Sequence, residues 1–365
     1  MGSGALVNLK KILYNMLYPR PEKVLGLDLG ADRVKIVQVN LKNLQNPEVT
    51  DYALTDLPAE LRGPDTLSDV EGWSTFLSEI INKHGFSATN CVLAIGGRNA
   101  FIREIAMPPM SREEMQQAIT WDSTQYVPYE ADSYYVDFDI FSDLNKDGQQ
   151  PVILAATPKV VVDSLLSITD KMELNVLRMD VEVLSIYRPM QDLYKDFVLV
   201  DMGQQYALMT IFQKGAPVAQ RSIPWGAVNF AKIIAEKMNI SISSALETME
   251  KEALLTSEAA EEQAVRDALR AEVDAFAKEV RRTSDYYILN KKDTSFTNLV
   301  LVGRGSKLAG IAGYMDDLLD VKVAIFNILD KVKFDSRFEK KKVAENAPSL
   351  VAAIGAALAG GESND

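Results

Sequence analysis

The sequence holds very little material for metal or nucleophilic chemistry, with one cysteine and one histidine among 365 residues. Structural zinc sites usually take four Cys or His ligands, and catalytic triads need a histidine beside the nucleophile. The composition therefore argues against a zinc protein and against a triad hydrolase. Cys91 lies in an apolar run, so we expect a buried, reduced thiol and no disulfide framework, as is typical of the cytosol.

Long apolar runs and an excess of positive charge are also missing. A membrane-spanning helix needs roughly 18 to 20 apolar residues, and the longest run, 350–359, is shorter and rich in alanine. We expect that run to be a buried helix. Lys10, Lys11 and Asn15 interrupt the apolar N-terminal residues, so no signal peptide is expected. The net charge of −12 argues against nucleic acid as a partner, because binding phosphate backbones requires a basic surface.

What is present is an ordinary globular composition, 47% hydrophobic and 25% charged. The chain is long enough for two or more domains, each with its own core. Strand-like runs alternate with helical patterns along its whole length, which predicts a mixed α/β fold.

Two segments share one pattern, a strand followed by Asp-x-Gly, a tight turn and a second strand. Asp28 and Gly30 carry it in the first half, and Asp201 and Gly203 carry it about half a chain later. Backbone N–H groups in such turns form an anion-binding concavity. Two copies could hold the phosphates of one nucleotide from both sides, which predicts a duplicated, actin-like fold.

Three further features would complete a nucleotide site. Lys35 follows the first turn and could reach a phosphate, and Asp28 could hold Mg²⁺ through water. Gly303-x-Gly305-Ser306 is predicted to turn from a strand into a helix, where glycine lets a base or ribose approach the backbone. The full set of predicted pocket positions is Asp28, Gly30, Ala31, Asp32, Lys35, Asp201, Gly203, Gln204, Gly303, Gly305 and Ser306.

Other segments point to one family within the actin-like superfamily. The blocks are 105–122, which includes Met-Pro-Pro-Met-Ser-Arg-Glu-Glu-Met, then 125–129, 137–140, 155–158, 301–310 and 348–358. Together they resemble the type IV pilus assembly protein PilM family over roughly residues 22 to 360. The most diagnostic block is 105–140, because nucleotide-site motifs are shared across the whole superfamily.

The resemblance implies an FtsA-like arrangement, a cytoplasmic place peripheral to the inner membrane, and a role in pilus assembly. It implies binding of the N-terminal tail of a PilN-like protein in a groove between the first subdomain and an inserted one. A pilus ATPase or platform protein is a further expected partner, and a homo-oligomer is expected. The expected parts are an amphipathic segment (1–22), subdomain IA (23–100 and 177–196), inserted subdomain IC (101–176), subdomain IIA (197–228 and 295–361), subdomain IIB (229–294) and an acidic tail (362–365).

The predicted nucleotide site departs from the family pattern in each of its motifs. The first turn, usually small and hydroxyl-rich, contains Asp32, and the second contains Tyr206, which would crowd a γ-phosphate. Arg304 interrupts the usual glycine triplet. Where a lysine often lies near the adenine, this chain has Met249, although Lys251 could serve if the alignment shifts by two.

Three interpretations remain open. The favoured one is a PilM-like scaffold, not an enzyme, with a degraded pocket that binds no ATP/Mg or binds it weakly. The second is a PilM-like protein that binds ATP and uses it to set domain closure and partner binding. The third, an active ATPase or sugar-kinase relative, lacks a recognisable base or water-positioning residue.

Three segments leave alternatives of their own. Leu6, Leu9, Ile12, Leu13, Met16 and Leu17 share one helical face, so residues 5–18 could contact a membrane surface or pack on protein. The apolar stripe of the predicted helix 258–288 favours packing within the chain over a coiled-coil partner. The basic segment 327–345 is expected to be an irregular, solvated loop, before a final helix at 349–359.

Overall fold

Two sheets form the two halves of the chain, and five strands of the first correspond in order to the five strands of the second. The structure is a computed structural model that describes residues 20–63, 66–141, 143–290 and 296–362. The first sheet has the order β14-β3-β2-β1-β4-β8 and the second the order β11-β10-β9-β12-β13. Their strands are β1 (Lys23–Leu29), β2 (Arg33–Asn40), β3 (Glu48–Asp56), β4 (Asn90–Ile95), β8 (Asn175–Val181), β14 (Lys333–Phe334), β9 (Phe197–Met202), β10 (Ala207–Gln213), β11 (Ala216–Ile223), β12 (Asn298–Val302) and β13 (Lys322–Ile325).

The duplication extends to strand direction. In the first half β1 pairs antiparallel with β2 and parallel with β4, and in the second β9 pairs antiparallel with β10 and parallel with β12. Asp28 and Asp201 therefore lie on equivalent first strands of the two sheets. The predicted duplicated fold is confirmed at the level of strand order.

A third, smaller sheet is inserted between β4 and β8 in the sequence. It has the order β5-β7-β6, made of β5 (Phe101–Met107), β7 (Gln150–Pro158) and β6 (Tyr134–Asp139), and its own core includes α3 (Arg112–Asp122). Ser111 caps α3 through a capping box with Glu114. Helix α4 (Lys159–Lys171) follows β7 and packs against α2 (Val70–His84) of the first half. The predicted limits of this subdomain, 101–176, remain a prediction.

Four α-helices lie in the described part of the second half between β11 and β13. They are α6 (Ala227–Met238), α7 (Ile242–Lys251), α8 (Gln263–Asn290) and α9 (Ile311–Leu318). The predicted stripe of α8 is buried at Val265, Leu269, Val273, Phe276 and Val280, and the helix packs against α6 and α9. Packing within the chain therefore accounts for the stripe.

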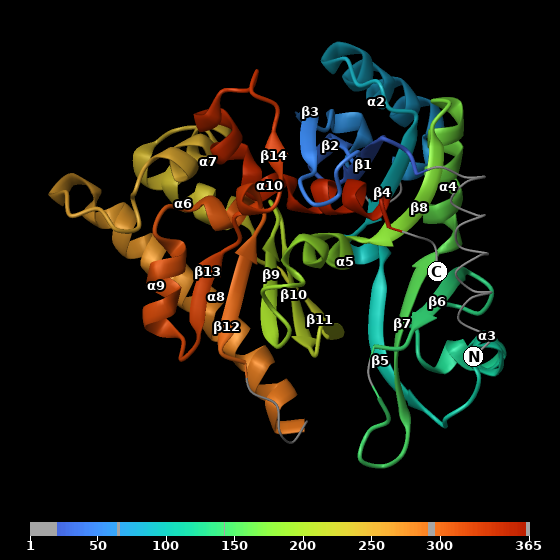
Figure 1. The fold of residues 1–365 in the computed structure, drawn as a ribbon. Coiled ribbons are helices and arrows are strands. Elements are labelled where there is room, and N and C mark those ends of the chain that lie inside the picture. Colours follow the sequence, from blue (N-terminus) through green and yellow to red (C-terminus); the bar gives the residue numbers. More distant parts are fainter. Residues whose placement is uncertain (1–19, 64–65, 142, 291–295, 363–365) are drawn as a thin grey trace.

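Helix α10 (Lys340–Ala359) runs across the molecule beneath the first sheet and also contacts β12 of the second (Figure 1). Its packing depends on two glycines that allow close backbone approach. A Cβ on Gly26 would lie 1.8 Å from the Ala353 carbonyl oxygen, and one on Gly355 would lie 1.7 Å from that of Ser185. Helix α10 is thus wedged between β1 and α5 (Glu182–Tyr187).

Two predictions near the C-terminus were wrong. The helix begins at Lys340 and not at 349, and the basic segment before it contains β14, which pairs with β3. Proline lacks an N–H group and favours the first turn of a helix, so Pro348 favours a predicted helix start beside it. In the structure Pro348 lies inside α10. Glu362, the first residue of the expected tail, is held by ion pairs to Arg178 and Arg188 at 2.9 and 2.7 Å.

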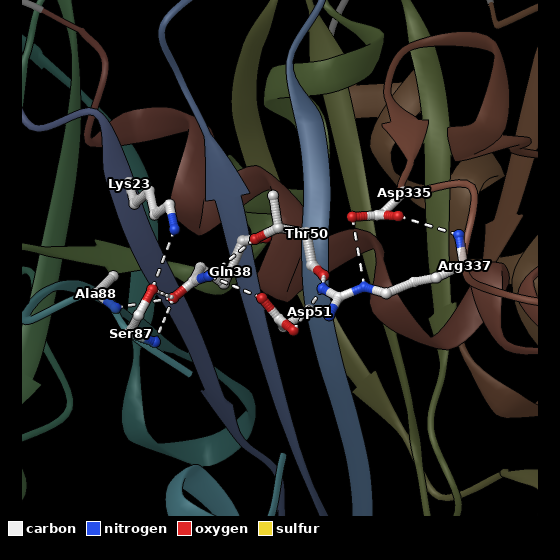
Figure 2. A network of polar contacts seen from close by, with 8 residues as sticks. All are labelled: Lys23, Gln38, Thr50, Asp51, Ser87, Ala88, Asp335 and Arg337. Carbon is white, nitrogen blue, oxygen red and sulfur yellow. Dashed lines mark hydrogen bonds and ion pairs between the residues drawn. The ribbon is translucent and has the colours of Figure 1, made fainter. Parts of the chain in front are cut away.

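A polar network fixes this returning segment against the first sheet (Figure 2). Buried Gln38 donates to Asp51 at 2.8 Å and accepts from the backbone N–H groups of Ser87 and Ala88. The other carboxylate oxygen of Asp51 accepts from Arg337 at 2.8 Å. Because every buried polar atom in this chain of contacts has a partner, the network positions the segment that leads into α10.

Within the described residues, no helix is both long and apolar enough to cross a bilayer. The predicted amphipathic face at residues 5–18 lies outside the described part of the chain.

Candidate functional site

A cavity of about 100 Å³ lies between the two halves and is lined by residues of both. The ends of β1 and β9, the turns that follow them and the start of the 3-10 helix η7 (Arg304–Lys307) meet there. Nine of the eleven predicted pocket positions line it: Asp28, Gly30, Ala31, Asp32, Lys35, Asp201, Gly203, Gln204 and Gly303. The other two, Gly305 and Ser306, are buried beneath, where the Ser306 hydroxyl donates to the Gly303 carbonyl at 2.7 Å.

The first hairpin places a lysine directly on its aspartate. Asp28 and Lys35 are cross-strand partners on β1 and β2, so their side chains lie on the same face of the sheet. Lys35 Nζ lies 2.7 Å from Asp28 Oδ2, and the two side chains are 20% and 4% exposed. Burial works against the lysine's charge, but the neighbouring Asp28, Glu182 and Asp201 raise the pKa of Lys35. Lys35 neutralises Asp28 in the structure, and its contact with a phosphate stays a prediction.

The other cation near the first turn is also committed elsewhere. Arg33 Nε lies 2.6 Å from Asp56 Oδ1 on β3. Asp32, between Ala31 and Arg33, accepts a hydrogen bond from Gln205 of the second half at 3.3 Å. Neither Arg33 nor Lys35 therefore neutralises the Asp32 carboxylate.

Two more carboxyl groups, those of Glu182 and Asp201, line the cleft. Burial, with Asp28 and Asp201 adding to it, raises the pKa of Glu182 to about 8. Burial also raises the pKa of Asp201 to about 6, with Lys35 opposing that rise. Glu182 begins α5 and lies against Gly96, where a Cβ would be 1.7 Å from its Oε2. Sequence reasoning missed Glu182, although its position directly after β8 resembles that of the two predicted aspartates at strand ends.

The second hairpin turn reaches across the cleft into the first half. Its Gly203 N–H donates to the Tyr206 carbonyl at 3.0 Å, which closes the turn between β9 and β10. The Tyr206 side chain lies against Gly97, where a Cβ would be 2.2 Å from the phenol oxygen. Burial raises the pKa of Tyr206 to about 12, so the phenol stays neutral. The turn that would cradle phosphate thus places a tyrosine ring in the cleft.

The third motif forms an ion-pair cluster with a residue that the sequence did not single out. Arg304 Nε lies 2.7 Å from Glu250 Oε1, and its Nη1 donates to Gln204 Oε1 at 2.8 Å. Lys307 also pairs with Glu250, and the two cations lower the pKa of Glu250 against the effect of burial. Glu250 lies on α7, so the cluster ties α7 to η7 at the side of the cleft expected to receive the base.

The two residues considered for an adenine contact do not reach the cleft. Met249 is fully buried in the core, and Lys251 is exposed and pairs with Glu247 one helical turn away at 3.2 Å. Glu250, between them on the helix, is the residue of α7 that points toward the third motif.

A second cavity, of about 340 Å³, adjoins the first, and about half of the residues that line it are apolar. Its walls come from the first half and from α4, and include Leu57, Leu61, Leu67, Trp73, Leu93, Ile95, Val161 and Leu165. Seven residues line both cavities: Asp28, Gly30, Ala31, Asp32, Glu182, Gln205 and Tyr206. The two cavities therefore share part of their walls.

The duplicated sheets and the cleft between their first strands define an actin-like protein. The family model of the type IV pilus assembly protein PilM matches residues 26–360, and the chain belongs to this family. Both predictions, of fold and of family, are confirmed.

Solved structures show the same fold. A PilM–PilN type IV pilus biogenesis complex contains a chain with a TM-score of 0.79 and 24% identity, covering 94% of this chain and 100% of that one. The ethanolamine utilization protein EutJ from Carboxydothermus hydrogenoformans has a TM-score of 0.54 and 16% identity, covering 98% of this chain and 99% of that one. A chain of the MamK double helical filament has a TM-score of 0.53 and 11% identity, covering 93% of this chain and 99% of that one.

Proposed function

We propose that this chain is a structural adaptor of the type IV pilus assembly platform, peripheral to the cytoplasmic side of the inner membrane, that holds the N-terminal tail of a PilN-like protein. Family membership supports the pilus role. The similar PilM–PilN complex supports the partner. The observation that carries the proposal is the apolar cavity between the first half and α4, the region in which the resemblance expects the tail.

The cavity suits an apolar peptide segment. Trp73 and Leu93 form part of its wall in the first half, and Val161 and Leu165 contribute from α4. Burying apolar surface contributes about 25 cal/mol per Å², so a few leucine-sized side chains would contribute several kcal/mol toward the cost of association. A PilN-like tail that supplies such side chains is the occupant we propose.

The chemistry of the cleft supports the second part of the proposal, a pocket that binds ATP/Mg weakly or not at all. Lys35 already neutralises Asp28, the predicted water-mediated Mg²⁺ site. Among the described residues, no cation pairs with Asp32. A phosphate about 5 Å from its carboxylate would meet a repulsion of roughly 3 kcal/mol per unit charge, with an effective dielectric constant near 20. The Tyr206 ring fills space that a γ-phosphate would need. The residues present do not fit Mg-ATP.

One observation favours the alternative of an ATP-binding protein whose nucleotide state controls the partner. Both Asp-x-Gly hairpins are intact, and their residues line one cleft from both halves. In that case a bound nucleotide would have to displace Tyr206 and break the pair between Asp28 and Lys35.

Tail binding is tested with a fluorescently labelled synthetic peptide that carries the N-terminal tail of the PilN-like protein encoded in the same genome. We expect its anisotropy to rise saturably with added protein. Replacing the half-buried cavity residue Leu67 by Asp should abolish binding. The control Val160→Asp changes an α4 side chain that is 64% exposed and outside the cavity, and should bind normally. No anisotropy change at high protein concentration would refute the adaptor proposal.

A further inference from the structure

We infer that Gln205 and Tyr206, from the second half, complete the tail-binding cavity of the first half. The inference rests on the proposed function, because it takes the PilN-like tail as the occupant. All other residues that line the cavity within the described chain lie between Asp28 and Glu182, before the second half begins. Gln205 and Tyr206 of the second half therefore close one side of the cavity.

The contacts of these two side chains cross between the halves. Tyr206 lies against Gly97, which has a φ of +64° and no side chain to obstruct the ring. Gln205 Nε2 donates to Asp32 Oδ1 at 3.3 Å. If the halves moved apart, both side chains would leave with the second half, and the apolar cavity would open onto the polar cleft.

This geometry links binding of the tail to closure of the two halves. A ligand whose site exists only in the closed arrangement stabilises that arrangement by its binding free energy. An apolar tail in the cavity should therefore hold the halves together, without a nucleotide in the cleft. The ring of Tyr206 supplies the wall, so Tyr206→Phe should preserve the effect and Tyr206→Ala should remove it.

Affinity is the first measurement. We expect Tyr206→Ala to weaken binding of the labelled tail peptide about tenfold, equivalent to about 1.4 kcal/mol. Tyr206→Phe should bind within about twofold of the unsubstituted chain, a difference well below 1 kcal/mol. Gln205→Ala, a milder change at an exposed position, should give a smaller loss and guards against misfolding of the alanine variant at 206.

The second measurement is the distance between the two halves. If Tyr206 only packed locally against its neighbours, replacing it would not change the effect of the tail on this distance. Spin labels at Glu79→Cys on α2 and Lys232→Cys on α6, with Cys91→Ala, report the distance between the halves by pulsed electron paramagnetic resonance. The tail should narrow this distance distribution in the otherwise unsubstituted chain and leave it broad in Tyr206→Ala.

The outcomes separate the two proposals. If the tail binds the unsubstituted chain, and Tyr206→Ala binds it equally well with the same narrowing, the inference is overturned while the adaptor function stands. If the tail does not bind the unsubstituted chain at all, both are overturned. Weaker binding by Tyr206→Ala together with loss of the narrowing supports the inference.

Discussion

At the scale of single residues, the cleft is dominated by three carboxyl groups that share one lysine. Asp28, Asp201 and Glu182 come from different elements and converge on Lys35. Burial, with the two aspartates adding to it, raises the pKa of Glu182 to about 8. Glu182 therefore keeps its proton at neutral pH, and Lys35 already neutralises Asp28. The raised pKa of Glu182 makes the stability of the fold depend on pH.

Glu182 sets the sign of that dependence. In the folded chain its carboxyl group keeps a proton that the unfolded chain loses near the ordinary pKa of 4.5. The folded state therefore binds more protons between 4.5 and about 8, so its stability falls as the pH rises through this window. Glu182→Gln keeps an acceptor for the Gly97 N–H without the charge. At the upper end of the window it should be more stable by about 1 to 3 kcal/mol, given about 1.4 kcal/mol per pKa unit.

Urea unfolding of both proteins across this pH range checks the prediction. The unsubstituted chain should lose stability toward higher pH, and the glutamine variant should lose less. Parallel pH profiles for the two would show that Glu182 ionises normally in the folded state.

At the scale of elements, the paired hairpins were predictable and the elements at the sheet edges were not. Asp-x-Gly between two apolar strands specifies β1–β2 and β9–β10 from local sequence alone. Strands β13 and β14 have four and two residues, too few for an alternating pattern to stand out, and β14 exists only through its pairing with β3. Glu250 was missed for a related reason, since its partners are more than 50 residues away in the sequence.

Helix α10 offers a sharp test of close packing between elements. Gly355→Ala would place a methyl group 1.7 Å from the Ser185 carbonyl oxygen, within the backbone of α5. We expect a loss of about 3 kcal/mol or more in the free energy of unfolding, because neither backbone can yield without displacing the core.

Gly313→Ala is the matched control. It lies on α9 with no atom within 4 Å of the added methyl group, so helix propensity should stabilise it by up to about 1 kcal/mol. Thermal or urea unfolding of the two variants gives the comparison. Equal stability of the two variants would contradict the described packing of α10 on α5.

At the scale of the whole molecule, strand pairing, helix packing and side-chain contacts join the two halves in addition to the backbone connections between them. Strand β14 returns to the first sheet, α10 packs on that sheet, and Tyr206 and Gln205 reach across the cleft. In this account the chain's own side chains occupy the place of a nucleotide between the halves. The actin-like frame is then a means of joining partners, and its motif residues serve mainly to build the frame.

If Asp32 and Tyr206 keep Mg-ATP out of the cleft, replacing both residues should restore a nucleotide site. Asp32→Ser combined with Tyr206→Ser removes the unneutralised acid and the ring, and leaves hydroxyl groups that can donate to phosphate. This double variant should bind Mg-ATP more tightly than the unsubstituted chain, and it serves as the positive comparison for the decisive experiment.

Isothermal titration of the unsubstituted chain with Mg-ATP tests the claim most directly. If the pocket is degraded, the titration should show no saturable heat, or binding too weak to approach saturation. A dissociation constant in the micromolar range or below would contradict it, and would show that the cleft opens past Tyr206 and the Asp28–Lys35 pair to admit a nucleotide.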